Sequence, residues 1–175
     1  MHKHIALIGL SGTGKSTVAH ILAERSGWDW GDTDAVIVAQ TGRTIAEIFA
    51  SEGETAFRNR ETAVLRTMLQ AATRPYVIAT GGGIVLQAAN RDLLRAYAYV
   101  VWMDAPTSTL LARLQAHAEQ RPLLAADDPR ARLDALRAER CHLYQALADQ
   151  VIDTSNLTSE QVAAAVLDGY QASAS

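Results

Sequence analysis

Apolar and polar positions alternate along the chain between short apolar runs and longer stretches with helical spacing. Apolar runs that predict buried strands occupy residues 5–10, 76–79, 98–103 and 151–153, with a shorter candidate at 28–30. Helical spacing fills the intervals, at residues 16–26, 35–40, 44–50, 54–72, 86–97, 107–117, 131–150 and 158–171. About five short strands that alternate with helices predict an α/β fold, a three-layer α/β/α sandwich around a central parallel sheet.

Length and composition narrow this picture. The 175 residues correspond to one domain over 1–175, and a hydrophobic content of 49% is enough for a packed core. The polar stretch 117–128 is rich in residues that interrupt helices and predicts a mobile lid. We expect the tail after about residue 170 to be disordered.

Charge and apolar run length exclude several classes of protein. The net charge of −3 argues against nucleic acid or an anionic membrane as a partner. The longest uncharged run that resembles a membrane helix, 75–90, is interrupted by three glycines, and the first apolar run is too short for a signal peptide. The single cysteine, Cys141, cannot form an internal disulfide. We therefore expect a cytoplasmic monomer without nucleic-acid or membrane partners.

The first apolar run leads into a glycine-rich turn. Residues 9–16, GLSGTGKS, match the pattern G-x-x-x-x-G-K-[ST], with a predicted strand before them and a predicted helix after them. In such a loop the backbone N–H groups surround a nucleoside triphosphate, the lysine reaches the β- and γ-phosphates, and the final hydroxyl binds Mg²⁺. The residues expected to bind the nucleotide are Gly12, Thr13, Gly14, Lys15, Ser16 and Thr17. The alternative is a structural glycine turn with a chance Lys-Ser, although the only other lysine is Lys3.

A small chain with this loop favours a kinase of a small molecule. No lysine follows Lys15, which excludes the Asn/Thr-Lys-x-Asp element with which GTPases usually recognise guanine. Motors and helicases are usually larger and carry more surface for nucleic acid. A second glycine cluster at 81–83 follows another predicted strand and favours close approach of the backbone to a ligand, with an ordinary loop as the alternative.

Two aspartates follow the second predicted strand. Ligands bind at the carboxyl ends of parallel strands. Of Asp32 and Asp34, one can therefore interact with Mg²⁺ and the other with a substrate. The alternative is that Asp34 or Thr33 only caps the next helix. Asp104 competes for the metal role because it ends the most apolar strand, but a turn or capping role is the simpler interpretation there.

Two arginines occupy unusual positions. Arg140 falls on the apolar side of the second long helix, where a buried guanidinium needs a carboxylate or a ligand. Arg58 lies next to Phe57 and three residues before Glu61, a spacing that lets Glu61 hold it in one rotamer. The alternatives are an internal ion pair for Arg140 and a solvated surface pair for Arg58.

Taken together, these residues resemble the shikimate kinase family, whose members are phosphate-loop kinases similar to the nucleoside monophosphate kinases. The resemblance covers nearly the whole chain in order. The matching segments are residues 9–17, 32–34, 41–45, 53–54, 57–58 with 61, 81–83, 121–124, 140 with 143–144, and 151–154.

The resemblance implies ATP-dependent phosphorylation of the 3-hydroxyl of shikimate, a step towards chorismate and the aromatic amino acids. By position, it implies that Asp34 accepts hydrogen bonds from substrate hydroxyls and is the proposed base, and that Asp32 supports Mg²⁺. It further implies that Arg58 and Arg140 bind the shikimate carboxylate, with the backbone at Gly82 nearby, in a pocket whose apolar walls are Phe49 and Phe57. The resemblance also implies that Arg121, on the mobile lid, reaches the phosphates and that Arg113 stacks on adenine.

A few positions depart from the family pattern, and two other functions compete. Gly31 stands where the family usually has an apolar residue, Val38 where an acid is frequent, and the stretch from Arg113 to Arg121 is one residue longer. The rival enzyme is a kinase of another small polyol acid such as gluconate. The other rival is an inactive relative that only binds a ligand, but Lys15, Asp34 and Arg121 are all present.

Overall fold

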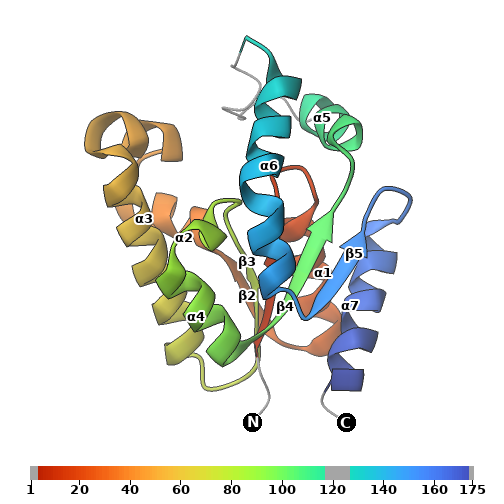
Figure 1. The fold of residues 1–175 in the computed structure, drawn as a ribbon. Helices are drawn as coiled ribbons and strands as arrows, with labels where there is room; N and C mark the ends of the chain where they lie inside the picture. The colour runs from red at the N-terminus through yellow and green to blue at the C-terminus, as the bar shows by residue number, and fades with distance from the viewer. Residues whose placement is uncertain (1–3, 117–126, 174–175) are drawn as a thin grey trace.

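A central parallel sheet organises the molecule, as Figure 1 shows. The computed structural model describes residues 4–116 and 127–173. The strands are β1 (His4–Ile8), β2 (Asp29–Asp32), β3 (Tyr76–Ala79), β4 (Ala98–Asp104) and β5 (Gln150–Asp153). They pair in parallel in the order β2-β3-β1-β4-β5, which confirms the predicted sheet.

Helices cover both faces of this sheet. They are α1 (Lys15–Ser26), α2 (Thr33–Thr41), α3 (Ile45–Ala71), α4 (Ala88–Tyr97), α5 (Thr107–Ala116), α6 (Pro129–Leu147) and α7 (Ser159–Ser173), with a 3₁₀ turn, η1, at Ile84–Leu86. One face packs against α3, α4, α5 and α6, and the other against α1 and α7. The predicted three-layer α/β/α sandwich is therefore confirmed. None of these helices is long and apolar enough to cross a membrane, within the described part of the chain.

The alternation of side chains along each strand explains why both faces must be covered. In β1, Ile5 and Leu7 pack towards α1 and α7, while Ala6 and Ile8 pack towards the opposite helix layer. All of them are fully buried. A strand that is apolar on both faces can be stable only between two layers of helices, which is the usual position of a parallel sheet.

Four segments differ from the sequence predictions. Helix α6 ends at Leu147, where the prediction extended it to residue 150, because Gln150 already pairs with β4 as part of β5. Residues 45–71 form one element, α3, because the two predicted helices meet at a kink at Gly53 (φ 83°, ψ 171°). Helix α4 begins at Ala88, two residues later than predicted, because residues 84–86 form the 3₁₀ turn. Helix α7 continues to Ser173, so residues 171–173 are helical where a disordered tail was expected. Most of the predicted lid, residues 117–126, lies outside the described residues.

The strand order places β1 between β3 and β4. The chain moves to one side of β1 to build β2 and β3 and to the other side to build β4 and β5. The loops that follow β1, β3 and β4 therefore diverge from one another above the carboxyl end of β1. Open parallel sheets bind ligands in the crevice that forms at such a point.

Candidate active site

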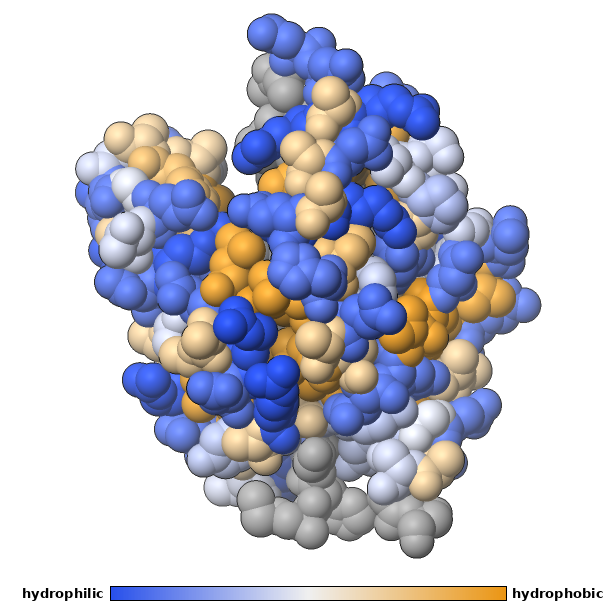
Figure 2. All heavy atoms as spheres, viewed as in Figure 1, coloured by the Kyte–Doolittle hydropathy of each residue, from blue (hydrophilic) through white to orange (hydrophobic). Residues whose placement is uncertain are grey.

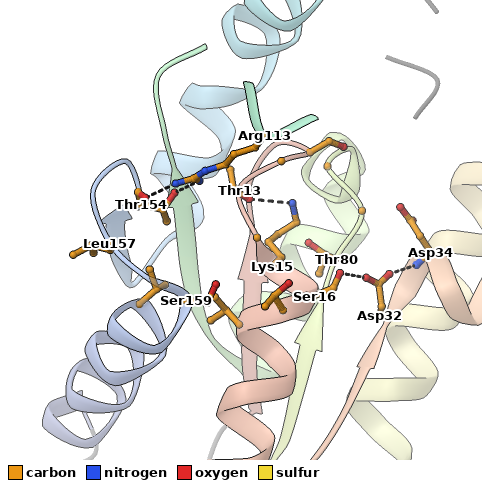
Figure 3. Close-up of a pocket in the computed structure, with 18 of the residues that line it drawn as sticks. Thr13, Lys15, Ser16, Asp32, Asp34, Thr80, Arg113, Thr154, Leu157 and Ser159 are labelled. Carbon is orange, nitrogen blue, oxygen red and sulfur yellow. Dashed lines mark hydrogen bonds between the residues drawn. The ribbon is translucent and has the colours of Figure 1, made fainter. Parts of the chain in front are cut away.

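A cavity of about 500 Å³ opens at this carboxyl edge of the sheet. Its wall is formed by the loop between β1 and α1, the end of β2, the start of the loop after β3, and the segment that joins β5 to α7. Figure 3 shows Asp34 at one end of this cavity, Leu157 and Thr154 at the other, and Lys15 between them. The cavity therefore has two ends separated by the glycine-rich loop.

The phosphate loop, residues 9–16, has the conformation that its glycines allow. Gly9, Gly12 and Gly14 all have positive φ, which L side chains rarely adopt. The loop ends at the N-terminus of α1, where backbone N–H groups and the helix dipole attract an anion. The Lys15 ammonium is buried there and donates to the carbonyls of Gly9 (2.7 Å) and Leu10 (2.8 Å). The predicted phosphate-binding geometry is thus present in the loop.

Asp32, Thr33 and Asp34 have three distinct contacts. The Ser16 hydroxyl donates to Asp32 Oδ2 at 2.5 Å, and Asp32 Oδ1 accepts from the N–H of Asp34 (2.9 Å) at the start of α2. Asp32 is therefore the cap of α2, and the alternative that Asp34 or Thr33 caps it is wrong. The buried Thr33 hydroxyl instead accepts from the N–H of Gly81 at 3.0 Å, a contact that the sequence did not predict.

The Asp34 carboxyl faces the cavity without a capping duty. Its Oδ1 atom is buried and has no hydrogen-bond partner among the described residues. Burial raises the pKa of Asp34 to about 6, the charge of Asp32 adds to the rise, and Lys15 and Arg58 oppose it. The residue lines the cavity, and a pKa close to neutrality suits a carboxyl group that receives a proton.

Arg58 is buried, with an exposed fraction of only 7%, so the alternative of a solvated surface pair is wrong. Its guanidinium donates to Glu61 at 2.9 Å, the spacing that the sequence predicted, and lies 3.3 Å from Glu54 as well. The same group stands 5.2 Å from the ring centre of Phe57 and 5.9 Å from that of Phe49. These contacts hold Arg58 in one position, as a rigid anion site requires.

Arg140 approaches the same place from α6. Its side chain is 13% exposed, and its ion-pair partner is the adjacent Glu139, which is itself 53% exposed. It therefore does not form the internal ion pair between helices that was the alternative for this residue. A Cβ placed on Gly82 would lie 3.7 Å from Arg140 Nη1, so the guanidinium lies beside the backbone of the loop after β3.

The glycine loop, residues 81–83, brings these groups together because it has no side chains. A Cβ on Gly81 would lie 2.5 Å from Asp34 Oδ1 and 2.9 Å from Glu61 Oε1, and one on Gly83 would clash with Arg58. Burial raises the pKa of Glu61 to about 7, with Arg58 opposing the rise. The absence of side chains at this loop thus lets its backbone lie against two carboxyl groups and two arginines, and its approach to a ligand stays a prediction.

The remaining predicted residues divide between the two ends of the cavity and the fold. Arg113 lines the far end, where its guanidinium donates to Thr154 Oγ1 (2.9 Å) and to the Thr154 carbonyl (2.6 Å). Asp104 pairs with Arg137 at 2.5 Å, so its carboxylate fastens α6 to the end of β4 and is not free for a metal ion. The predicted phosphate contact of Arg121 lies outside the described residues.

Fold and site together define a class: a kinase with the phosphate-loop nucleotide-binding fold, which holds a small acceptor beside its nucleotide. Comparison with known proteins identifies the family. The family model "Shikimate kinase" matches residues 11–171. A shikimate kinase of Symbiobacterium thermophilum is 43% identical over 169 residues, which cover 96% of each chain. One of Chromobacterium violaceum is 47% identical over 149 residues, or 85% of this chain and 79% of that protein.

A solved structure agrees with these relatives. Shikimate kinase from Acinetobacter baumannii in complex with shikimate superposes with a TM-score of 0.91 at 36% identity, over 98% of this chain and 94% of that one. The chain belongs to the shikimate kinase family. It is accordingly an ATP-dependent phosphotransferase, which confirms the resemblance that its motifs indicated.

Proposed function

We propose that this site transfers the γ-phosphate of ATP to the 3-hydroxyl of shikimate, with the roles divided between the two ends of the cavity. One observation carries the proposal: an unpartnered aspartate and two arginines surround the glycine loop directly beside the phosphate loop. Shikimate carries one carboxylate and several hydroxyls, which is the chemistry that this set of side chains complements. The shikimate-bound relative supports the same assignment.

The nucleotide occupies the phosphate loop and the end of the cavity near Thr154. Lys15 exchanges its contacts with the loop carbonyls for the β- and γ-phosphates, and residues 12–17 supply backbone N–H groups and hydroxyls to the same anion. Arg113 is held by Thr154 at the edge of this end, and we propose that its planar group stacks on adenine there.

Ser16 and Asp32 fit a magnesium ion. Their oxygen atoms lie 2.5 Å apart beside the phosphate loop, and Mg²⁺ prefers one or two such hard oxygen ligands together with phosphates and water. The described residues contain no cluster of three or more potential metal-binding side chains, so we propose that the ion arrives with ATP. Bound there, Mg²⁺ would neutralise charge on the phosphates.

The acceptor lies across the glycine loop from the nucleotide. Arg58 and Arg140 hold its carboxylate with their planar forks, and the Gly82 backbone lies between them and the phosphate loop. The rings of Phe49 and Phe57, whose centres are 4.7 Å apart, form an apolar wall beside Arg58. Figure 2 shows a notch between the upper end of α3 and α6, and these side chains belong to the helices on its two sides.

Asp34 orients the reacting hydroxyl and receives its proton. As the hydroxyl oxygen bonds to the γ-phosphorus, the bond to the bridging oxygen of ADP breaks, and the proton passes to the Asp34 carboxylate, which lines the cavity. Phosphoryl transfer usually has a loose transition state, so the nucleophile needs little activation until late in the reaction. Positioning and charge neutralisation by Lys15 therefore supply more of the rate enhancement than the base does.

A coupled assay of ADP release tests this function. We expect release that depends on shikimate, with gluconate and buffer alone giving only the background rate. Turnover of gluconate at a comparable rate would contradict the acceptor assignment. The phosphate contact of Arg121 on a lid, the cytoplasmic location, the monomeric state and the absence of nucleic-acid and membrane partners stay predictions.

A further inference from the structure

Tyr144 lies on α6 one helical turn after Arg140 and is fully buried. Its ring packs on Trp102 of β4, with ring centres 5.8 Å apart and planes inclined by 30°. Its hydroxyl donates a hydrogen bond to the carbonyl of Gly82. The mechanism proposed above does not use this hydroxyl, although it reaches the middle of the glycine loop.

Gly82 lies where the two halves of the site meet. A Cβ on Gly82 would be 3.5 Å from the carbonyl oxygen of Gly9 in the phosphate loop and 3.7 Å from Arg140 Nη1. The Gly9 carbonyl is in turn held by Lys15 at 2.7 Å. A small rotation of the Gly82 peptide therefore changes the distance from the loop backbone to Arg140 while the phosphate loop stays fixed by its own contacts.

Three consecutive glycines cannot hold such a position alone. Glycine has more accessible backbone conformations than any other residue, so a run of three needs external contacts to stay in one of them. The N–H of Gly81 is anchored on Thr33 Oγ1 at 3.0 Å, and the carbonyl of Gly83 accepts from Leu86 at 3.0 Å. The Tyr144 hydroxyl supplies the contact in the middle.

The hydroxyl is also well suited to remain a donor. Burial raises the pKa of Tyr144 above its ordinary value, and the positive charge of Arg140 only partly opposes the rise. The group therefore stays protonated throughout the working pH range of the enzyme. Its contact with the Gly82 carbonyl fixes the backbone that lies beside the Arg140 guanidinium.

We propose that Tyr144 is a positioning residue that sets the affinity for the acceptor by fixing Gly82 relative to Arg140. The inference rests on the proposed function, because it assumes that these two groups hold the shikimate carboxylate. Its effect is confined to the acceptor, because the phosphate loop has an anchor of its own: the Thr13 hydroxyl donates to the Leu10 carbonyl at 2.9 Å.

The test is Tyr144→Phe, which removes the hydroxyl and keeps the ring on Trp102. We expect the KM for shikimate to rise about fivefold to tenfold, as for the loss of one buried hydrogen bond, while the KM for ATP changes less than about twofold. The matched control is Tyr99→Phe. Its hydroxyl bonds to Gln150 at 3.3 Å, on the opposite face of the sheet, and its removal should change neither KM.

Turnover of shikimate by the wild-type enzyme is measured first, because its absence would refute the proposed function and not the role of Tyr144. Once turnover is established, an unchanged KM for shikimate in Tyr144→Phe overturns the inference. Equal increases in both KM values also overturn it, since they indicate a general loss of structure. A double-mutant cycle with Arg140→Lys adds a second criterion. If Tyr144 acts by positioning the groups that bind the shikimate carboxylate, the effects of the two substitutions on the KM for shikimate are not additive.

Discussion

At the scale of single residues, neighbouring arginines on α6 serve different purposes. Arg137 donates to both carboxylate oxygens of Asp104 and to the carbonyl of Ala105, so its fork is fully used within the protein. Arg140, one turn further along, has the exposed Glu139 as its one ion-pair partner among residues 4–116 and 127–173, and it lies beside the glycine loop. The first residue stabilises the fold, and the second has a planar fork available to a ligand.

Arg→Lys substitutions at these two positions separate the roles. Lysine keeps the charge and loses the bidentate geometry. We expect Arg140→Lys to weaken shikimate binding roughly 10–150-fold, for a loss of about 1.5–3 kcal/mol, with nucleotide binding and melting temperature nearly unchanged. Arg137→Lys should lower the melting temperature and leave the ratio of the two affinities as it is. Calorimetric titrations and melting curves of both variants check this, and a destabilised Arg140→Lys with normal shikimate affinity would contradict it.

The Asp34 carboxylate gives a second prediction at this scale. Because Asp32 and not Asp34 caps α2, Asp34→Asn should leave the helix intact and lower kcat by about 10²–10⁴-fold, the usual cost of losing a general base. The control is Asp149→Asn, which alters a carboxylate that accepts from the Val100 N–H at 2.8 Å at the far end of the sheet. Near-normal turnover by Asp34→Asn would show that Asp34 has a structural role and is not the general base.

Which of these residues could be predicted depends on how local their evidence is. Lys15 and Ser16 belong to a contiguous motif, and the Arg58–Glu61 contact follows from helical spacing, so the sequence alone predicted them. The contacts of Thr33 with Gly81 and of Arg113 with Thr154 join segments 48 and 41 residues apart. No periodicity links such segments, and only the folded sheet brings them together.

At the scale of elements, the kink in α3 shapes one wall of the acceptor site. Gly53 interrupts the helix with φ 83° between Phe49 and Phe57, whose rings then meet with centres 4.7 Å apart. Glu52 bridges Arg43 and Arg60 across the same bend, at 3.2 and 2.7 Å. Helical periodicity continues on both sides of Gly53, so the sequence predicted the two halves and could not predict that they join into one bent element.

Gly53→Ala tests the importance of the bend. The added methyl group meets nothing within 4 Å, so its effect comes from the backbone: φ 83° with ψ 171° is a conformation essentially restricted to glycine, and it costs an L-residue on the order of 1–3 kcal/mol. Straightening the bend would relieve this strain and separate the two rings, so we expect a higher KM for shikimate as well as a lower melting temperature. Gly42→Ala is the matched control, with φ 66° and the same open space, and should lower the melting temperature only. Identical KM values for the two variants would contradict this role of the kink.

One departure from the family pattern, Gly31, has a local explanation at the same scale. A Cβ on Gly31 in β2 would lie 2.7 Å from the Tyr76 hydroxyl and 2.9 Å from Met68 Cε. Side chains from β3 and α3 therefore fill the space that an apolar residue would occupy in β2. The replacement of an apolar residue by Gly31 therefore affects only the edge of the core. It involves none of the residues proposed to bind the acceptor.

At the scale of the whole molecule, the site places two buried carboxyl groups beside each other at a cost to stability. Asp34 Oδ1 and Glu61 Oε1 both face Gly81 and both have no hydrogen-bond partner among the described residues. Burial is the main cause of the raised pKa of each group, to about 6 for Asp34 and about 7 for Glu61. The arrangement favours a group that receives a proton over a maximally stable fold.

This cost predicts opposite pH trends for stability and activity. Between their ordinary pKa values, near 4, and the raised ones, these carboxyls bind more protons in the folded chain than in the unfolded one, so the free energy of unfolding falls as pH rises. We expect a fall on the order of 2 kcal/mol between about pH 5 and pH 7.5. Over the same window kcat/KM should rise with an apparent pKa near 6, as Asp34 loses its proton.

Denaturant unfolding and initial-rate measurements at the same series of pH values check both trends, and Glu61→Gln separates the two groups. This variant cannot ionise at position 61, so its stability should depend less on pH, while Asp34 still produces the rise in kcat/KM. Burial lowers the pKa of His4, which contributes a rise in the free energy of unfolding over part of the same window, so the decisive comparison is between the wild type and Glu61→Gln. The same pH dependence in both proteins would show that the folded protein holds the Glu61 carboxylate ionised without penalty, and Arg58 would then have to stabilise this charge more strongly than burial destabilises it.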